Sequence, residues 1–281
     1  MGLEPWHAFL CGDGGMMPQA SPRYIKIFAA FLKAGLQSEI EYRINILLRF
    51  VTDLIWYAAQ IFMFEVIFLH VNRLGGLGHE EMRVFLGILF VVDALYMVFF
   101  SDNMDNFPDL VRKGDLDFLL VKPVNTQFIV STQKITLSFL LNLLMGVGWL
   151  TWSLNRLPHL TFWQPVLLLV LLPCGTLIFY AMRFMFASLA LVFTQSDSFM
   201  HVWFQFYKLG MRPDSIYQPW MRFFLMTLVP VSLIASVPSR LVLEPLHPGL
   251  AAWVVLVTVG LLYLSHRVWN VLIRHYVSAS S

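Results

Sequence analysis

Five ionisable residues lie inside otherwise apolar stretches, where a charged side chain needs a partner: Asp53, Glu65, Asp93, Lys134 and Arg183. A charge at the centre of a lipid bilayer costs from about 2.5 to more than 10 kcal/mol, so such a group must pair, reach water or reach the headgroups. Asp53, Lys134 and Arg183 fall near the ends of their stretches, where snorkelling to the interface explains them. For Glu65 and Asp93 a helix–helix hydrogen bond, a protonated carboxyl and a functional role all stay open, although one or two carboxylates do not make a proton relay.

The sequence contains none of the compact motifs that carry hydrolytic, metal or nucleotide chemistry. GxSxG, HExxH and GxxxxGK[ST] are all absent, and the eight histidines are scattered. The two cysteines, Cys11 and Cys174, form no CxxC pair. We therefore expect no enzymatic activity, no metal site and no cofactor on this chain, and any energy from ATP must come from a partner.

Composition places the chain in the membrane class. Hydrophobic residues make up 58% of the 281 residues and charged residues 13%, against about 25% charged in soluble domains. The net charge of +2 gives no argument for nucleic acid. The sequence predicts an all-α polytopic protein with six transmembrane helices.

The apolar runs divide the chain into a tail and one membrane domain. Residues 1–22 are rich in glycine, which predicts a flexible tail. Residues 23–281 are predicted to form the transmembrane domain. Residues 23–43 have helical periodicity and predict a helix lying in the membrane interface, with a soluble core helix as the alternative. The predicted spans are 50–71, 84–100, 128–152, 163–193, 199–238 and 249–270.

The fifth of these spans is expected to be broken. Lysine and arginine are more frequent before the first span, in 101–127 and in the C-terminal tail than in the other loops, which places both termini and 101–127 in the cytoplasm. The segment 199–238 must then supply one net crossing. Its four prolines predict a short helix at about 199–209, an irregular turn and a re-entrant helix pair on the outer side. A single kinked helix is the alternative.

The loop 101–128 carries the signals of a short capped helix followed by an apolar stretch. The helix signals, in chain order, are Asp105, Pro108, Asp109, Arg112, Lys113 and Gly114. The apolar residues that follow are Leu116, Phe118, Leu119 and Leu120. Such a stretch is too short to span a membrane, and it favours either a docking element for a soluble partner or a loop folded back on its own bundle.

The residues from Arg112 to Asn125, RKGDLDFLLVKPVN, resemble the signature G-x-L-D-x-x-L-x-[KR]-P-V-N of ABC transporter permeases. More narrowly, they resemble the six-span group of the ABC type-2, exporter-type superfamily. A second region is similar to the family's R-Y-P-x-x-I-Y and following proline motifs: Arg212 to Tyr217, Trp220 to Arg222, Val229 to Val231, and Val237-Pro238. The family's aromatic residue before the first proline is missing here, and Ser232 and Leu233 stand where alanine and phenylalanine are common.

The resemblance implies a permease subunit that works with two separate ATPase subunits and a second permease subunit in the bacterial inner membrane. ATP and Mg²⁺ would bind the ATPase partner. The implied ATPase-coupling residues are Asp105, Phe107, Leu110, Arg112, Gly114, Leu116, Phe118, Leu119, Lys122 and Pro123. The implied outer-gate residues are Pro213, Tyr217, Arg222, Pro230 and Pro238. The alternative is an ion- or proton-coupled secondary transporter that uses Glu65 and Asp93 and needs no ATPase.

Overall fold

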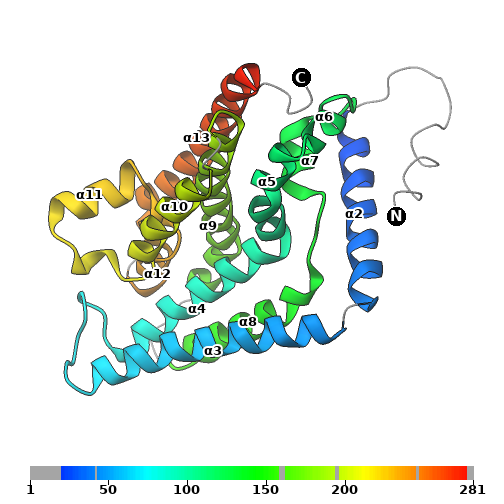
Figure 1. The fold of residues 1–281 in the computed structure, drawn as a ribbon. Helices are drawn as coiled ribbons and strands as arrows, with labels where there is room; N and C mark the ends of the chain where they lie inside the picture. The colour runs from blue at the N-terminus through cyan, green and yellow to red at the C-terminus, as the bar shows by residue number, and fades with distance from the viewer. Residues whose placement is uncertain (1–19, 42, 158–161, 194–195, 245–246, 277–281) are drawn as a thin grey trace.

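The computed structural model describes residues 20–41, 43–157, 162–193, 196–244 and 247–276, and these residues are helical with short connections (Figure 1). The α-helices are α2 (Ala20–Glu41), α3 (Arg43–Phe68), α4 (His79–Tyr96), α5 (Asp102–Arg112), α6 (Asp115–Leu120), α7 (Thr126–Thr132), α8 (Leu140–Leu154), α9 (Trp163–Ser188), α10 (Ser196–Gly210), α11 (Pro219–Thr227), α12 (Ser236–Leu243) and α13 (Pro248–Leu272). Within these ranges the extended structure amounts to a single bridge between Leu74 and Leu77. The predicted all-α class is confirmed. The greater part of the predicted tail lies outside the described residues.

Within the described ranges, five helical stretches are long and apolar enough to cross a bilayer, which needs about 20 residues. They are Leu47–Phe68, His79–Arg112, Leu137–Leu154, Trp163–Leu191 and Pro248–His275. Each overlaps one of the predicted spans. The protein is thus an all-α polytopic membrane protein, and the sixth crossing stays a prediction.

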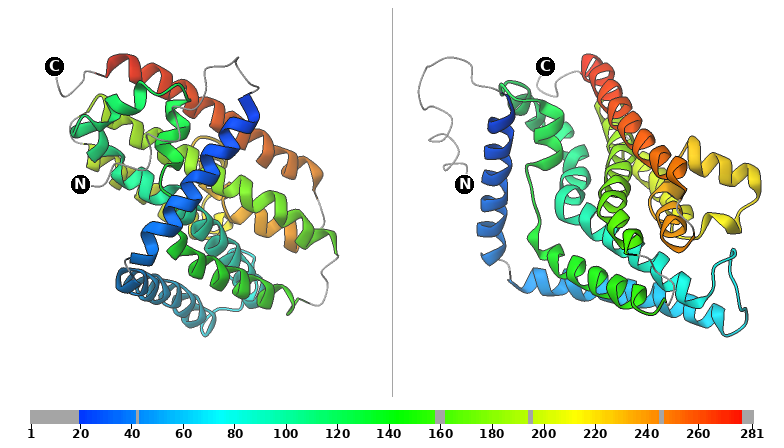
Figure 2. Two further views of the ribbon diagram at one scale, coloured as in Figure 1. Left: turned by 90° about the vertical axis from the view of Figure 1, so that its right-hand side faces the viewer. Right: turned by 180° about the vertical axis from the view of Figure 1, so that it is seen from behind.

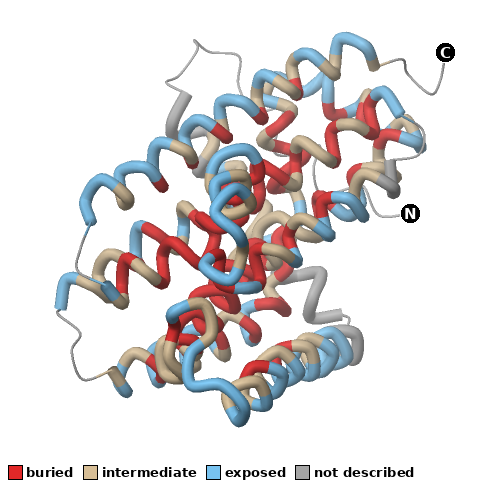
Figure 3. The backbone as a smooth tube through the Cα atoms, turned by 90° about the vertical axis from the view of Figure 1, so that its left-hand side faces the viewer, coloured by how far each residue is buried: buried red, intermediate tan, exposed pale blue. Residues whose placement is uncertain are grey.

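Helix α4 forms the centre of the bundle, with α8 packed on one side and α9 on another, while α13 covers α9. The α4–α8 crossing is close because glycines face it. A Cβ on Gly87 would lie 2.9 Å from the Leu150 Cα, and one on Gly146 would lie 3.3 Å from the Phe90 backbone. Small residues allow this approach between membrane helices. Buried residues concentrate on α4 and α9, whereas α3 and α13 are largely exposed (Figure 3).

Helix α2 runs across the direction of α3 and beside the region of α5 and α7 (Figure 2). Phe28, Phe31 and Leu32 pack on a small cluster formed by Val98, Ile135 and Phe139. The packing is tight, since a Cβ on Gly35 would lie 2.3 Å from the Ile135 carbonyl oxygen. The helix predicted for 23–43 is thus present, and its position in the membrane interface stays a prediction.

The second span differs from the prediction because it does not stop at residue 100. It continues through a π-helix (Met97–Ser101) directly into α5, so that one helical stretch runs from His79 to Arg112. Pro108 therefore lies inside α5 and not in a first helical turn. A π-helix frees backbone groups from the regular ladder, and π-bulges are frequent at functional sites.

The predicted third span, 128–152, is also interrupted. Helix α7 ends at Thr132, and helical structure resumes only at Leu137. The Asn103 amide replaces the missing backbone partners by donating to the Lys134 carbonyl at 2.7 Å and accepting from its N–H at 2.9 Å. The Thr136 N–H donates to the carbonyl of Val98 in the π-helix. The two irregular segments thus satisfy each other, as buried backbone groups require.

The segment predicted to be broken is broken. Helix α10 ends at Gly210, and a 3₁₀ turn (Asp214–Ile216), α11, a second 3₁₀ turn (Val231–Leu233) and α12 follow. These pieces return against α9, where a Cβ on Gly175 would lie 2.8 Å from the Ile234 carbonyl oxygen. A single kinked helix is thereby ruled out for the backbone of this segment.

Candidate functional site

Helices α5 and α6 form a short helix–turn–helix unit, which we call the α5–α6 turn. It lies at one end of the molecule, near the first turns of α2 (Figure 1). Gly114 connects them with φ +76°, a left-handed conformation that glycine adopts without strain. Beyond α6, Asn125 caps α7 by accepting from the Phe128 N–H at 3.1 Å. Following the predicted orientation, which stays a prediction, we call this end, with residues 102–125, the inner end. The opposite end, with residues 69–78 and α11, is the outer end.

The inward face of the α5–α6 turn packs on the bundle. Phe107, Leu116 and Leu119 are buried, and Leu110 is half-buried. The Phe107 ring lies 6.0 Å from the Trp269 ring on α13, which in turn lies 5.4 Å from Phe184 on α9. The apolar stretch after Gly114 thus partly folds back on its own bundle.

The outward face of the same turn is apolar and open. The Phe118 side chain is 74% exposed and Val121 is 86% exposed, and Arg112, Lys122 and Pro123 are exposed beside them. Arg112 forms an ion pair with Asp109 within α5. Leu116 and Leu119 point inward while Phe118 points outward. Leu116 and Leu119 are three residues apart, and this helical spacing alone would have placed them on one face. Exposed apolar side chains rimmed by charge are typical of a protein-binding surface.

Ion pairs fix the α5–α6 turn to the membrane helices. Asp105 accepts from the Arg183 guanidinium on α9 at 2.5 Å, and Arg183 is only 16% exposed. Arg183 is thus paired within the protein, which the prediction from its place in the sequence missed. At the base of α5, Asp102 pairs with Arg49 on α3 at 3.4 Å and accepts from the Thr136 hydroxyl at 2.8 Å.

A buried polar network lies behind α7, and sequence reasoning did not find it. The Gln127 Oε1 accepts a hydrogen bond from His266 Nδ1 on α13 at 2.9 Å, and the Gln127 Nε2 donates to the Ser265 hydroxyl at 3.3 Å. The Tyr180 hydroxyl on α9 contacts Ser131 at 2.7 Å. These contacts tie α7, α9 and α13 together next to the α5–α6 turn.

At the outer end, the predicted gate residues sit in the broken segment. Pro213, Pro230 and Pro238 are buried, and Tyr217 and Arg222 are half-buried. The Tyr217 hydroxyl donates to the Leu209 carbonyl at 3.0 Å, which joins the turn to α10. Asp214, which the second motif contains but which was not singled out, is 2% exposed and pairs with Arg222 and Arg240.

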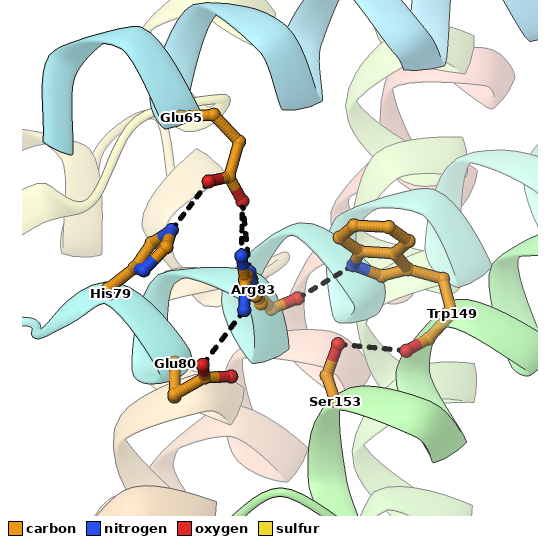
Figure 4. A network of polar contacts seen from close by, with 6 residues as sticks. All are labelled: Glu65, His79, Glu80, Arg83, Trp149 and Ser153. Atoms are coloured by element: carbon orange, nitrogen blue, oxygen red, sulfur yellow. Dashed lines mark hydrogen bonds and ion pairs between the residues drawn. The ribbon is translucent and has the colours of Figure 1, made fainter. Parts of the chain in front are cut away.

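The carboxylate of Glu65 belongs to a network that joins α3, α4 and α8 (Figure 4). It accepts from Arg83 Nε at 2.9 Å and contacts His79 Nε2 at 2.7 Å. The Trp149 indole on α8 donates to the Arg83 carbonyl at 3.0 Å. Glu65 therefore makes the helix–helix contact that was one of the readings for it.

Asp93 and Asp53 also bridge helices. The Asp93 carboxylate accepts from the Tyr57 hydroxyl at 3.3 Å and from the Tyr207 hydroxyl at 3.0 Å, which links α3, α4 and α10. Asp53 accepts from the Asn142 amide on α8 at 2.6 Å. Intramembrane polar groups commonly join helices in this way.

In the described residues, histidine, cysteine, aspartate and glutamate form no group of three or more that could hold a metal ion. The structure therefore gives no candidate metal centre in these ranges, and its polar clusters are ion pairs and hydrogen-bond bridges between helices. The functional candidates are the α5–α6 turn and the outer broken segment.

The sequence was compared with models of known protein families, with curated proteins and with solved structures. A family model described as "ABC-2 family transporter protein" matches residues 54–280, most of the chain. Neither the curated proteins nor the solved structures contain a match. The matched range includes the α5–α6 turn, the broken segment and all five long apolar helices except the first turns of α3. The chain is a multi-pass membrane transport protein that belongs to the ABC-2 transporter family.

Proposed function

We propose that this chain is the permease subunit of an ATP-binding cassette exporter, driven by a separate nucleotide-binding subunit. The observation that carries the proposal is the two-sided α5–α6 turn. Its outward face exposes Phe118 and Val121, to which a partner can bind. Its inward face is fixed to α9 and α13 through Asp105 and Phe107. Such an element can receive force at one surface and pass it to the membrane helices.

In this proposal two permease subunits assemble with two ATPases in a bacterial inner membrane, with both termini in the cytoplasm. ATP and Mg²⁺ bind the ATPases. Closing of the ATPase pair moves residues 105–123, and the motion opens the outer gate formed by Pro213, Tyr217, Arg222, Pro230 and Pro238. The second permease is either a copy of this chain or a related chain.

The proposal predicts a neighbouring reading frame that encodes an ATPase with a Walker A motif, and the test uses that ATPase. Phe118→Glu should lower ATPase copurification and abolish its stimulation, because a charge in an apolar contact is desolvated without a partner. Phe162→Glu is the matched control, since Phe162 is 73% exposed at the start of α9. Unchanged coupling in Phe118→Glu, or equal loss in both variants, would contradict the proposal.

The ion-coupled alternative has less support. Its two candidate carboxylates, Glu65 and Asp93, are held by Arg83, His79 and two tyrosines between helices. It predicts transport activity in the purified chain without any ATPase. The proposed function predicts that transport needs both proteins.

A further inference from the structure

A cavity of about 350 Å³ lies at the outer end, between the loop before α4 and the broken segment. Its walls come from residues 75–77, Glu81 on α4, residues 213–215, Arg222 on α11, and five residues in and after α12: Ser236, Ser239, Arg240, Leu243 and Glu244. In Figure 1 the loop before α4 reaches toward α11 and α12. The volume lies within the range of about 300 to 1,000 Å³ that small-molecule sites occupy.

One wall presents two arginines that a buried carboxylate holds in place. Asp214 accepts from Arg222 Nε at 3.1 Å and from Arg240 Nη2 at 2.9 Å. The Asp214 N–H is itself fixed by the Ser236 hydroxyl at 3.2 Å. A guanidinium group carries five N–H donors, so these contacts leave donors of both arginines available. Two positive charges against one negative charge make this wall suited to an acid group.

The cavity also contains negative charge. Glu81 and Glu244 line it, and Glu81 is held in position because its Oε2 accepts from the Gly78 N–H at 2.7 Å. A simple anion would be attracted by the arginines and repelled by these carboxylates. A ligand with one acid group and one amine satisfies both, since complementary charges select a partner and like charges reject it.

The lining is too polar for a large apolar molecule. Leu77, Pro213 and Leu243 are its apolar side chains, and charged, hydroxyl and glycine residues make up the rest. We propose that this cavity binds a small zwitterion, with its phosphate or carboxylate on Arg222 and Arg240 and its ammonium on Glu81 and Glu244. The same chemistry occurs in a free solute and in the headgroup of phosphatidylethanolamine.

The cavity depends on one loop contact. The Ser215 hydroxyl donates to the Gly75 carbonyl, and a Cβ on Gly75 would lie 2.6 Å from that hydroxyl oxygen. Gly75 also has φ +58°. The loop before α4 can therefore pack on the broken segment only with glycine at position 75. A ligand that bridges α4 and α12 would hold the broken segment against the bundle. This role in gating, unlike the binding itself, rests on the proposed function.

The purified full chain in detergent tests the binding with three soluble probes. By isothermal titration, phosphoethanolamine should bind at least about tenfold more tightly than inorganic phosphate or ethanolamine, because it alone makes both charge-assisted contacts. Glu81→Gln keeps an acceptor for Gly78 but removes the charge, and should reduce phosphoethanolamine affinity to that of phosphate. Arg222→Gln should weaken the binding of both phosphoethanolamine and phosphate. The control, Arg267→Gln, changes an exposed residue of α13 and should alter neither affinity.

Nanodiscs separate the two sources of the ligand. Preferential retention of phosphatidylethanolamine over phosphatidylglycerol after purification, lost in Glu81→Gln, assigns the site to a lipid headgroup. Equal retention together with binding of phosphoethanolamine assigns it to a free zwitterion. Phosphate binding as tightly as phosphoethanolamine, or full affinity in both cavity variants, overturns the proposal. Glu81→Gln should still copurify with the ATPase, so failure of the cavity is distinguishable from failure of the proposed function.

Discussion

Arg183 on α9 and Asp105 on α5 form an ion pair at 2.5 Å although 78 residues separate them in the chain. The pair neutralises a largely buried guanidinium that would otherwise be costly within an apolar helix. It also gives the α5–α6 turn a direct connection to a membrane helix. Under the proposed function, this contact lies between the ATPase-binding surface and the bundle.

We therefore predict that Arg183→Gln separates docking from transmission. The ATPase should still copurify, because the Phe118 surface is unchanged, but ATP should no longer alter the thiol-labelling rate of a cysteine placed at outer residue Arg73. Exchanging the charges, with Asp105→Arg and Arg183→Asp, should restore part of the response. The loss in unfolding free energy should stay at about 1 kcal/mol or less, because Asp105 is about half exposed.

Arg267→Gln on α13 is the control and should keep the ATP response. A normal response in Arg183→Gln would show that force reaches the bundle by another contact. Phe107 against Trp269 would then be the next contact to test.

The predicted topology can be checked with an impermeant thiol reagent applied from outside to cells. In a background without Cys11 and Cys174, a cysteine at Arg73 should react, and one at Lys113 should react only after the membrane is opened. Both positions are exposed and avoid the positive-φ glycines beside them. The reverse labelling pattern would place the α5–α6 turn on the outer side and remove the basis for ATPase coupling.

A third prediction concerns the interruption of the third span. Asn103 is buried and holds both backbone groups of Lys134, so Asn103→Leu should lower the free energy of unfolding by about 2–4 kcal/mol. Asn106→Leu serves as the control, because Asn106 is exposed and contacts only the Asp102 carbonyl on its own helix among the described residues. Thermal unfolding in detergent measures both. Equal, small effects would mean that water replaces the Asn103 contacts.

The sequence allowed the spans and both motif regions to be located because apolar composition and proline positions are local signals. The continuity of α4 with α5 was missed because the polar residues around Asn103 were predicted to form a loop. They instead continue the helix beyond its apolar part. The break before Leu137 has no local signal, since its partner Asn103 lies 31 residues earlier. The same holds for Arg183, whose partner comes from another helix. Contacts between distant segments were therefore what sequence reasoning could not supply.

The last prediction tests how α2 is held. Gly35→Leu should lift α2 from the bundle, because even a Cβ at this position would lie 2.3 Å from the Ile135 carbonyl oxygen. Tyr24 and Phe128 have ring centroids 5.2 Å apart, so cysteines at these two positions should be joined by a short bifunctional thiol reagent. The crosslinking rate should fall several-fold in Gly35→Leu and stay unchanged in Ala29→Leu, where the side chain is exposed. If both variants crosslink at the parental rate, the Gly35–Ile135 contact does not determine the position of α2. If both are equally slow, added bulk anywhere on α2 is sufficient to displace it.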